Sequence, residues 1–203
     1  MNHLLLTIPF FFAAIIIHEF SHGWMAYKLG DPTAKYSGRL TLNPLAHIDP
    51  FGTILLPLLL LFLNSPVIFG WAKPVPINFW NLRHPKRDMV LVGIAGPLAN
   101  FILAFLLSLF LKLNLSSAIS IWLSSIILVN LVLGVFNLIP IPPLDGSRII
   151  SGIMPARLAI VYNQLERYGV IIIFLLLFTG VFDRLVWPFI NILGKLLGIN
   201  LNV

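Results

Sequence analysis

Five consecutive residues carry the most specific chemical signal in this chain: His18-Glu19-Phe20-Ser21-His22. On a helix, His18 and His22 lie one turn apart on the same face, a spacing at which two imidazoles can bind one metal ion. Glu19 supplies the carboxylate that a general base needs to take a proton from water. A purely structural role is the weaker interpretation, because three such residues in one turn of an apolar helix are costly in a membrane. The motif therefore predicts a zinc site.

A catalytic zinc ion needs a third protein ligand and one position left open for water. The chain has no cysteine, so we look among its acids. Asp145 is the best candidate, because three prolines end an apolar run just before it and force irregular backbone, which at membrane depth must be buried or line a cavity. A simple Asp145-Gly146 turn is the alternative. The other acids lie at the ends of apolar runs or on a polar turn, where we expect solvated side chains: Asp31, Asp49, Asp88, Asp183 and Glu166.

The composition indicates the medium in which these residues work. Of 203 residues, 59% are hydrophobic and only 10% are charged, and the mean hydropathy is +0.97. Soluble domains carry about 25% charged residues, so this chain has too little polar surface for a globule in water. A water-soluble cytosolic enzyme is excluded. The 13 Lys and Arg residues are scattered between apolar runs and form no basic face for nucleic acid.

The apolar runs predict an all-α, multi-pass membrane protein, one domain over residues 1–203 with five to six hydrophobic segments. Helices are expected at 4–29, 90–111, 119–139 and 168–182. The run 51–63 is too short to cross a bilayer upright, and residues 66–78 are rich in Val, Ile and Pro. Residues 51–80 are therefore expected to form a re-entrant segment or β-hairpin between the first two full-length helices. The stretch 185–197 fits either an interfacial helix or a short span.

Topology must bring Asp145 to the depth of the two histidines. His18 and His22 lie in the second half of the first helix, so two crossings, 90–111 and 119–139, return the chain to the metal's side. The positive charges agree with this topology, because ten lie on the metal's side and three on the other: Lys28, Lys35, Arg39, Lys73, Arg83, Lys86, Arg87, Arg148, Arg157 and Arg167 against Lys112, Arg184 and Lys195. By the positive-inside rule the metal's side is cytoplasmic, and the expected location is the cell membrane of a prokaryote.

A peptidase acting on a membrane segment must offer the extended substrate new backbone partners, as an edge strand does. Pro74 and Pro76 lack N–H groups on one edge of residues 67–78, while Val75 and Ile77 keep theirs on the other. Val75 and Ile77 are therefore predicted substrate contacts, with a lipid-surface loop as an equal alternative. His47 could be a fourth metal ligand, but its loop position favours an ordinary hydrogen bond.

The zinc motif, together with Asn137-Leu-Ile-Pro-Ile-Pro-Pro-Leu-Asp145-Gly146, resembles the site-2 protease family of intramembrane zinc metalloproteases, peptidase family M50. Gly96-Pro-Leu-Ala-Asn100 and Asn43-Pro44 also look like family features, so the resemblance covers most of the chain. We expect a compact member, without a PDZ or CBS module and without a spanning helix before the motif helix. The resemblance implies one Zn²⁺ held by His18, His22 and Asp145, Glu19 as general base, and Asn137 and Asn100 as polar contacts near the substrate or oxyanion.

The expected function is zinc-dependent hydrolysis of peptide bonds in or near transmembrane segments of other membrane proteins. Such proteins and the lipid bilayer are the expected partners, without nucleic acid, and no oligomeric state is predicted. Three alternatives stay open: a metal-ion transporter, a catalytically inactive zinc-stabilised scaffold, and a prenyl-protein peptidase. A transporter would be expected to place acids in several helices, whereas only Glu19 and Asp145 are expected to be buried here. A prenyl-protein peptidase would be expected to use a helical glutamate as third ligand.

Overall fold

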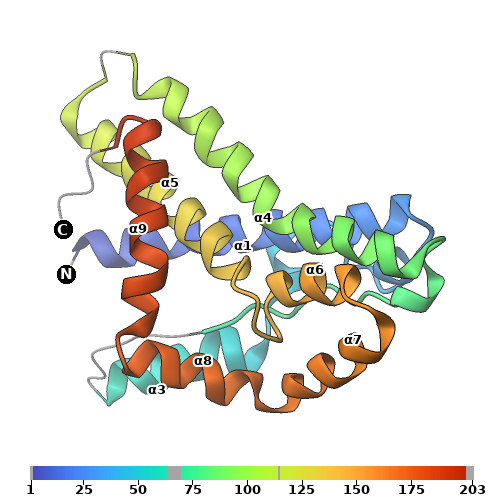
Figure 1. Cartoon of the computed structure of the whole chain (residues 1–203). Coiled ribbons are helices and arrows are strands. Elements are labelled where there is room, and N and C mark those ends of the chain that lie inside the picture. The colour runs from blue at the N-terminus through green and yellow to red at the C-terminus, as the bar shows by residue number, and fades with distance from the viewer. Residues whose placement is uncertain (1, 64–69, 114, 200–203) are drawn as a thin grey trace.

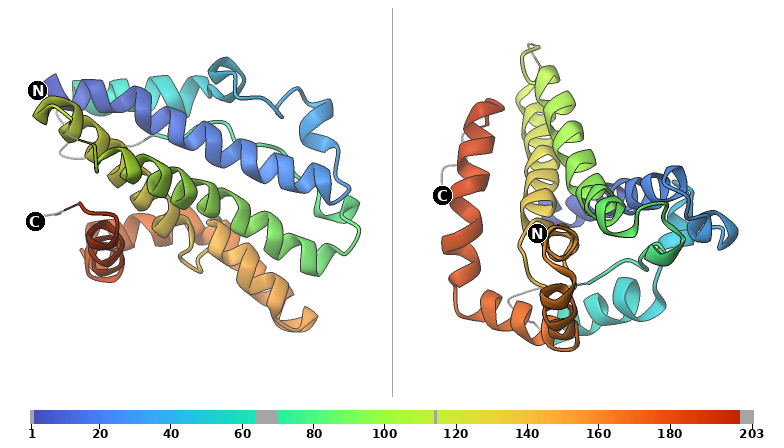
Figure 2. Two further views of the ribbon diagram at one scale, coloured as in Figure 1. Left: turned by 90° about the horizontal axis from the view of Figure 1, so that it is seen from above. Right: turned by 45° about the vertical axis from the view of Figure 1, so that its right-hand side comes forward.

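Three long helices form the frame of the molecule: α1 (Asn2–Lys28), α4 (Pro85–Phe110) and α5 (Ser117–Asn137). The computed structural model describes residues 2–63, 70–113 and 115–199. As Figures 1 and 2 show, α4 lies beside α1, and it packs against α1, α5 and the short helix α6 (Asp145–Ile153). Among these described residues, three helical stretches are long and apolar enough to cross a membrane: Pro85–Phe110, Ser117–Asn137 and Ala156–Phe178. The chain is thus an all-α membrane protein.

The shorter elements connect and flank this frame. The helices expected at 4–29, 90–111 and 119–139 correspond to α1, α4 and α5. The remaining elements are α2 (Thr33–Tyr36), η1 (Pro44–His47), the π-helical turn η2 (Pro50–Leu55), α3 (Leu56–Phe62), η3 (Phe79–Asn81), α7 (Ala156–Asn163), η4 (Gln164–Tyr168), α8 (Gly169–Phe178) and α9 (Val181–Leu196).

Two helix ends differ from the expected ones for local reasons. α4 begins at Pro85, five residues before the apolar run, because proline is favoured at the first helical position and the Asp88 carboxylate accepts the N–H of His84 at 2.9 Å. The segment expected at 168–182 is divided after α8, because Gly180 adopts a left-handed φ of +70° and turns the chain into α9. Apolar residues continue across this turn, so hydropathy alone does not reveal it.

α9 crosses the direction of α1 at a steep angle (Figures 1 and 2) and packs against α5. Its Val186 and Ile190 join Ile127 and Leu131 of α5 and Ala104 of α4 in the main apolar cluster. This cluster fixes α5 against α4.

The segment expected to be re-entrant, 51–80, contains η2, α3, an extended stretch over 70–78, and η3. The expected β-hairpin is not present in the described residues, which contain no assigned β-strand; residues 64–69 lie outside them. We call residues 70–78 the strap.

The strap is held along one edge by backbone groups of its odd-numbered residues. The N–H groups of Trp71, Lys73 and Val75 donate to the Gly52 carbonyl (3.1 Å), the His47 carbonyl (2.9 Å) and the Glu19 carboxylate (2.8 Å), respectively. Pro74 and Pro76 lie on the other edge, and the strap ends where the N–H of Asn78 donates to Asp31 at 2.7 Å. The strap is therefore tied to α1 beside the zinc motif.

Candidate metal centre

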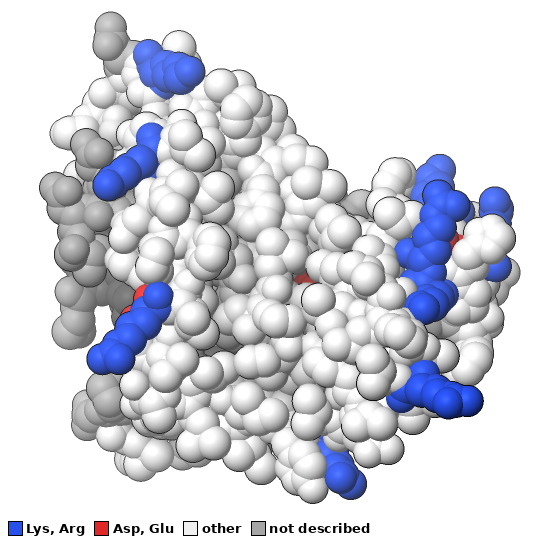
Figure 3. All heavy atoms as spheres, viewed as in Figure 1, with Lys and Arg blue, Asp and Glu red and all other residues white. Residues whose placement is uncertain are grey.

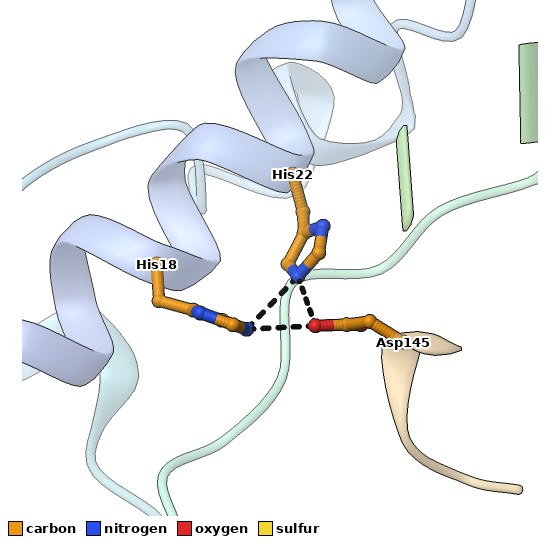
Figure 4. A group of neighbouring side chains, drawn as sticks. All are labelled: His18, His22 and Asp145. Atoms are coloured by element: carbon orange, nitrogen blue, oxygen red, sulfur yellow. Dashed lines mark hydrogen bonds and ion pairs between the residues drawn. The ribbon is translucent and has the colours of Figure 1, made fainter. Parts of the chain in front are cut away.

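The candidate metal centre lies where α1, α4 and α6 meet. His18 and His22 project from α1, and Asp145 is the first residue of α6, a position at which the helix dipole favours a carboxylate. α5 ends at Asn137 because the prolines that follow cannot continue it, and the chain turns back so that α6 packs on α4. Figure 4 shows the three side chains pointing toward one another. The structure thus brings together the three predicted ligands.

The facing atoms form a nearly equilateral triangle. His18 Nε2 lies 3.0 Å from His22 Nε2 and 2.9 Å from Asp145 Oδ2, and His22 Nε2 lies 3.0 Å from the same oxygen. Both imidazoles are buried, whereas the Asp145 side chain keeps 18% of its surface exposed. The centre is therefore enclosed but reachable from the side of Asp145.

The partner of Nδ1 in each imidazole shows that this nitrogen carries a proton, so the neutral ring has its lone pair on Nε2. His22 Nδ1 lies 2.7 Å from the Val92 carbonyl, which can only accept, so His22 Nδ1 carries the proton. His18 Nδ1 lies 2.6 Å from Asn100 Oδ1 and donates to it. With both imidazoles neutral, two Nε2 lone pairs and a carboxylate oxygen converge with no donor among them. Such an arrangement fits a bound cation, with the Nδ1 partners orienting the rings.

The donor set and the space around it fit Zn²⁺. Ligand atoms about 2.0–2.1 Å from a tetrahedral zinc ion lie roughly 3.3 Å from one another, close to the spacing seen here. Gly96 of α4 leaves this space open, because a Cβ at that position would lie 2.7 Å from His18 Nε2 and nearer still to His22 Nε2. Among the described residues, His18, His22 and Asp145 are the one group of His, Asp or Glu side chains close enough to share an ion.

Glu19 lies beside the metal ligands and is not one of them. Its side chain is half-buried, and its Oε2 accepts the N–H of Val75 at 2.8 Å. The strap thus binds one oxygen of the predicted general base.

Val75 and Ile77 contact groups of the protein itself that the sequence did not predict as their partners. The N–H of Val75, predicted to be open to a substrate, donates to Glu19, and the Val75 side chain is buried against α1 at Gly23. Ile77 packs against the apolar cluster of Ala26, Leu82 and Val92. Reasoning from the strand edge alone missed Glu19, which supplies an acceptor 56 residues away in the chain.

The two predicted asparagine contacts occupy different places. Asn100 is fully buried and bonds to His18, to the Ala14 carbonyl (3.3 Å) and to Asn130 (2.9 Å). Asn137 is partly exposed, and its Nδ2 donates to the Leu133 carbonyl of its own helix at 2.9 Å. The structure therefore joins Asn100 to the metal centre through His18, and it does not bring Asn137 to the three ligands.

The expectation that Asp31 and Asp88 are solvated is wrong, because both are buried. Asp31 accepts hydrogen bonds from the backbone and hydroxyl of Thr33, from the N–H of Asn78 and from Asn81 Nδ2. Burial raises the pKa of Asp31, but these hydrogen bonds outweigh it and hold the pKa below its usual range. Both acids follow a turn or open a helix, which are positions where a short carboxylate caps backbone N–H groups. This position in the sequence could have indicated that their carboxylates bind backbone instead of water.

The remaining candidates lie outside the centre. His47 is buried, with Nε2 2.8 Å from the Thr41 carbonyl, and it does not belong to the three-residue group. Glu166 is exposed and pairs with Arg148 at 2.7 Å.

Comparisons with known proteins give a consistent set of relatives. The family model "Peptidase family M50" matches residues 112–180. "Putative zinc metalloprotease YwhC" of Bacillus subtilis is 40% identical over 205 residues, which cover 94% of this chain and 87% of that protein. "Putative zinc metalloprotease Rip2" of Mycolicibacterium smegmatis is 28% identical over 183 residues, 89% of this chain and 69% of that protein. "Zinc metalloprotease MJ0392" of Methanocaldococcus jannaschii is 29% identical over 149 residues, 72% of this chain and 33% of that protein. No solved structure gives a significant match.

Proposed function

The chain belongs to peptidase family M50 and is a zinc metalloprotease, and from that premise we propose that it cleaves peptide bonds in or near transmembrane segments of other membrane proteins. One observation carries the proposal: three converging acceptors and an adjacent carboxylate lie against α4, one of the helices that are long and apolar enough to cross a membrane. A substrate of this enzyme must reach the centre through the bilayer or at its surface, so a membrane protein is the natural partner.

The residues divide the chemistry among them. His18, His22 and Asp145 would hold zinc, which when bound polarises a carbonyl group and makes water easier to deprotonate. Glu19 would accept a proton from water and pass it to the leaving amine, as general acid–base catalysis requires. With neutral imidazoles, the charges of the ion and the two carboxylates, Glu19 and Asp145, sum to zero, which lowers the cost of a charged site inside a membrane.

The distribution of basic residues supports a cytoplasmic position for the centre. Figure 3 shows Lys and Arg gathered toward the end of the molecule where α1 ends and α4 begins, with fewer along the opposite edge and a broad surface without Lys or Arg between them. In this proposal α1, α4, α5 and the stretch 156–178 cross the membrane, and residues 51–80 enter and leave it on the basic side. The positive-inside rule then makes that side cytoplasmic.

The strap is the segment that we place next to the substrate. It is extended backbone tied to the general base, and a substrate whose helix has unwound needs backbone partners of that kind. A substrate carbonyl that accepted the N–H of Val75 would release Glu19 for its work on water.

The transporter alternative has less support, although two more acids are buried than expected. Asp31 and Asp88 are held by backbone N–H groups close to the ends of α1 and α4, and each has a local capping role. Neither Asp31 nor Asp88 belongs to the group of side chains in the described residues that could hold a metal ion.

Glu19→Gln tests the proposed function against both a transporter and an inactive scaffold. The purified variant should keep about one zinc per chain and its fold, and its cleavage of a model transmembrane substrate should fall by roughly 10²–10⁴-fold, the contribution of a general base. Unchanged cleavage would contradict the proposal. A change in zinc flux across proteoliposomes without any cleavage by the wild type would favour the transporter.

A further inference from the structure

Two buried asparagines connect His18 to the backbone of another helix. Asn100 of α4 and Asn130 of α5 each have no exposed surface. Asn100 Oδ1 lies 2.6 Å from His18 Nδ1, Asn100 Nδ2 donates to Asn130 Oδ1 at 2.9 Å, and Asn130 Nδ2 donates to the Ile126 carbonyl at 2.9 Å. Three helices that come from distant parts of the chain therefore share one line of hydrogen bonds.

The direction of this line is fixed at two points by backbone carbonyls, which can only accept. The Ile126 carbonyl requires the amide nitrogen of Asn130 to face it, which turns Asn130 Oδ1 toward Asn100. The Ala14 carbonyl, 3.3 Å from Asn100 Nδ2, requires the same of Asn100, so Asn100 Oδ1 faces the imidazole. An oxygen in that place accepts a proton from His18 Nδ1, which leaves Nε2 with its lone pair directed to the metal centre.

We propose that Asn130 is a positioning residue for the zinc ligand His18: through Asn100 it sets the ring orientation and the nitrogen that carries the proton. The inference rests on the metal centre of the proposed function but not on peptide hydrolysis. Partners of this kind around metal-binding histidines typically change metal affinity by about 10–100-fold when they are removed.

A comparison within the centre shows why the role falls on Asn130. His22 is oriented directly by the backbone carbonyl of Val92, which a substitution cannot remove. His18 is oriented by a side-chain amide, and an amide can rotate by 180° and present its N–H₂ instead. Two acceptors oppose this rotation, and Asn130 supplies the nearer one, at 2.9 Å from Asn100 Nδ2 against 3.3 Å for the Ala14 carbonyl. In a membrane interior a wrongly turned amide would leave buried groups unpaired, so the arrangement with all partners satisfied is favoured.

Asn137 offers a matched control on the same helix. Its Nδ2 donates to the Leu133 carbonyl at 2.9 Å, the same bond to the residue four positions earlier that Asn130 makes with Ile126, but it has no link to His18. If Asn130 acted merely as a polar residue that bonds to its own helix, the two asparagines would respond alike to substitution.

The test measures zinc affinity of the full chain in detergent by competition with a chelator of known affinity. Asn130→Leu removes the acceptor at similar volume, and Asn130→Ser keeps a polar side chain that is too short to reach Asn100. Both should bind zinc roughly 10–100-fold more weakly than the wild type. Asn130→Asp, as the neutral acid, can accept from Asn100 and donate to Ile126, so it should restore the affinity. Asn137→Leu should leave zinc affinity unchanged.

A second measurement can be made on the wild type, so it does not require that an Asn130 variant folds. In the zinc-free wild type, the ¹⁵N resonances of labelled histidine should report His18 with its proton on Nδ1, and folded Asn130 variants without the acceptor should show a mixture of tautomers. A wild-type His18 with its proton on Nε2 would overturn the inference, as would equal zinc affinity in folded Asn130→Leu and wild type, or equal losses in Asn130→Leu and Asn137→Leu. Peptidase activity plays no part in these readouts, so a failure of the proposed function would appear separately, as zinc-loaded protein without cleavage.

Discussion

At the scale of single residues, the metal centre is defined by what each atom can donate or accept. His18 and His22 have their Nδ1 protons committed to Asn100 and to the Val92 carbonyl, so in the neutral imidazoles the Nε2 atoms and the Asp145 oxygen present only lone pairs to one another. Without a cation, such a group would be repulsive and costly in a buried site. The same group with zinc is stable, which is why the donor pattern is stronger evidence than proximity alone.

Gly96→Ala tests the space reserved for the ion. The new Cβ would lie 2.7 Å from His18 Nε2, inside the volume that the ion needs, and the packed backbones of α1 and α4 leave it little room to move. We expect the purified variant to lose most of its zinc while its helical content stays close to that of the wild type. Metal analysis and circular dichroism on the same sample check both parts, and a fully zinc-loaded Gly96→Ala protein would argue against the centre as described.

The sequence indicated some of these residues and missed others for a physical reason. His18, Glu19 and His22 share one helical turn, so their relation is visible in local spacing, and Asp145 stood out because prolines precede it. Asn130 is the one polar side chain between Ser125 and Asn137, and its partner Asn100 is 30 residues away on another helix. No local pattern encodes such a contact, although a polar side chain at membrane depth was itself a signal of function.

At the scale of elements, the strap connects Glu19, the proposed general base, to the rest of the fold. Its edge is tied to the 47–53 region, its centre to Glu19 and its end to Asp31. Gly23 permits this approach, because a Cβ there would lie 2.8 Å from Val75 Cγ1. Close contact between the strap and α1 therefore depends on a glycine next to His22, one of the proposed zinc ligands.

Gly23→Ala should move the strap and leave the metal in place. We expect peptidase activity to fall by about tenfold or more, since a displacement of the order of 1 Å near a reacting group is costly. Zinc content should stay at the wild-type level, in contrast to Gly96→Ala. The double variant Gly23→Ala/Val75→Ala removes the clashing methyl and should recover activity, as a double-mutant cycle would detect. Equal activities in the single variant and the wild type would show that the strap plays no part in catalysis.

The bounds of a helix could be predicted from the sequence where the length of its apolar run alone determines them. α1 and α5 follow their apolar runs closely. The start of α4 and the break between α8 and α9 were not predictable in this way, because a capping acid, Asp88, and a left-handed glycine, Gly180, determine them. The strap was recognised as extended chain, but its pairing to Glu19 and Asp31 depends on contacts between distant segments that alternation of side chains does not specify.

At the scale of the whole molecule, the fold serves to bring the first helix and the sixth together. His18 and Asp145 are 127 positions apart in the chain. Between them, the two long helices α4 and α5 carry the chain away from the metal centre and bring it back to the same depth. α4 makes the meeting possible, because it contacts α1, α5 and α6. The positive charges and the metal ligands therefore give independent support to one topology.

The zinc content of purified Asp145→Ala, compared with that of the wild type, tests this account most directly. Asp145 is the ligand whose participation requires the whole topology, since it reaches the histidines only if the chain crosses the membrane an even number of times between residue 29 and α6. We predict about one zinc per chain in the wild type and loss of most of it in a variant that still elutes as a folded protein. An Asp145→Ala protein that kept a full equivalent of zinc would contradict both the ligand set and the topology built on it.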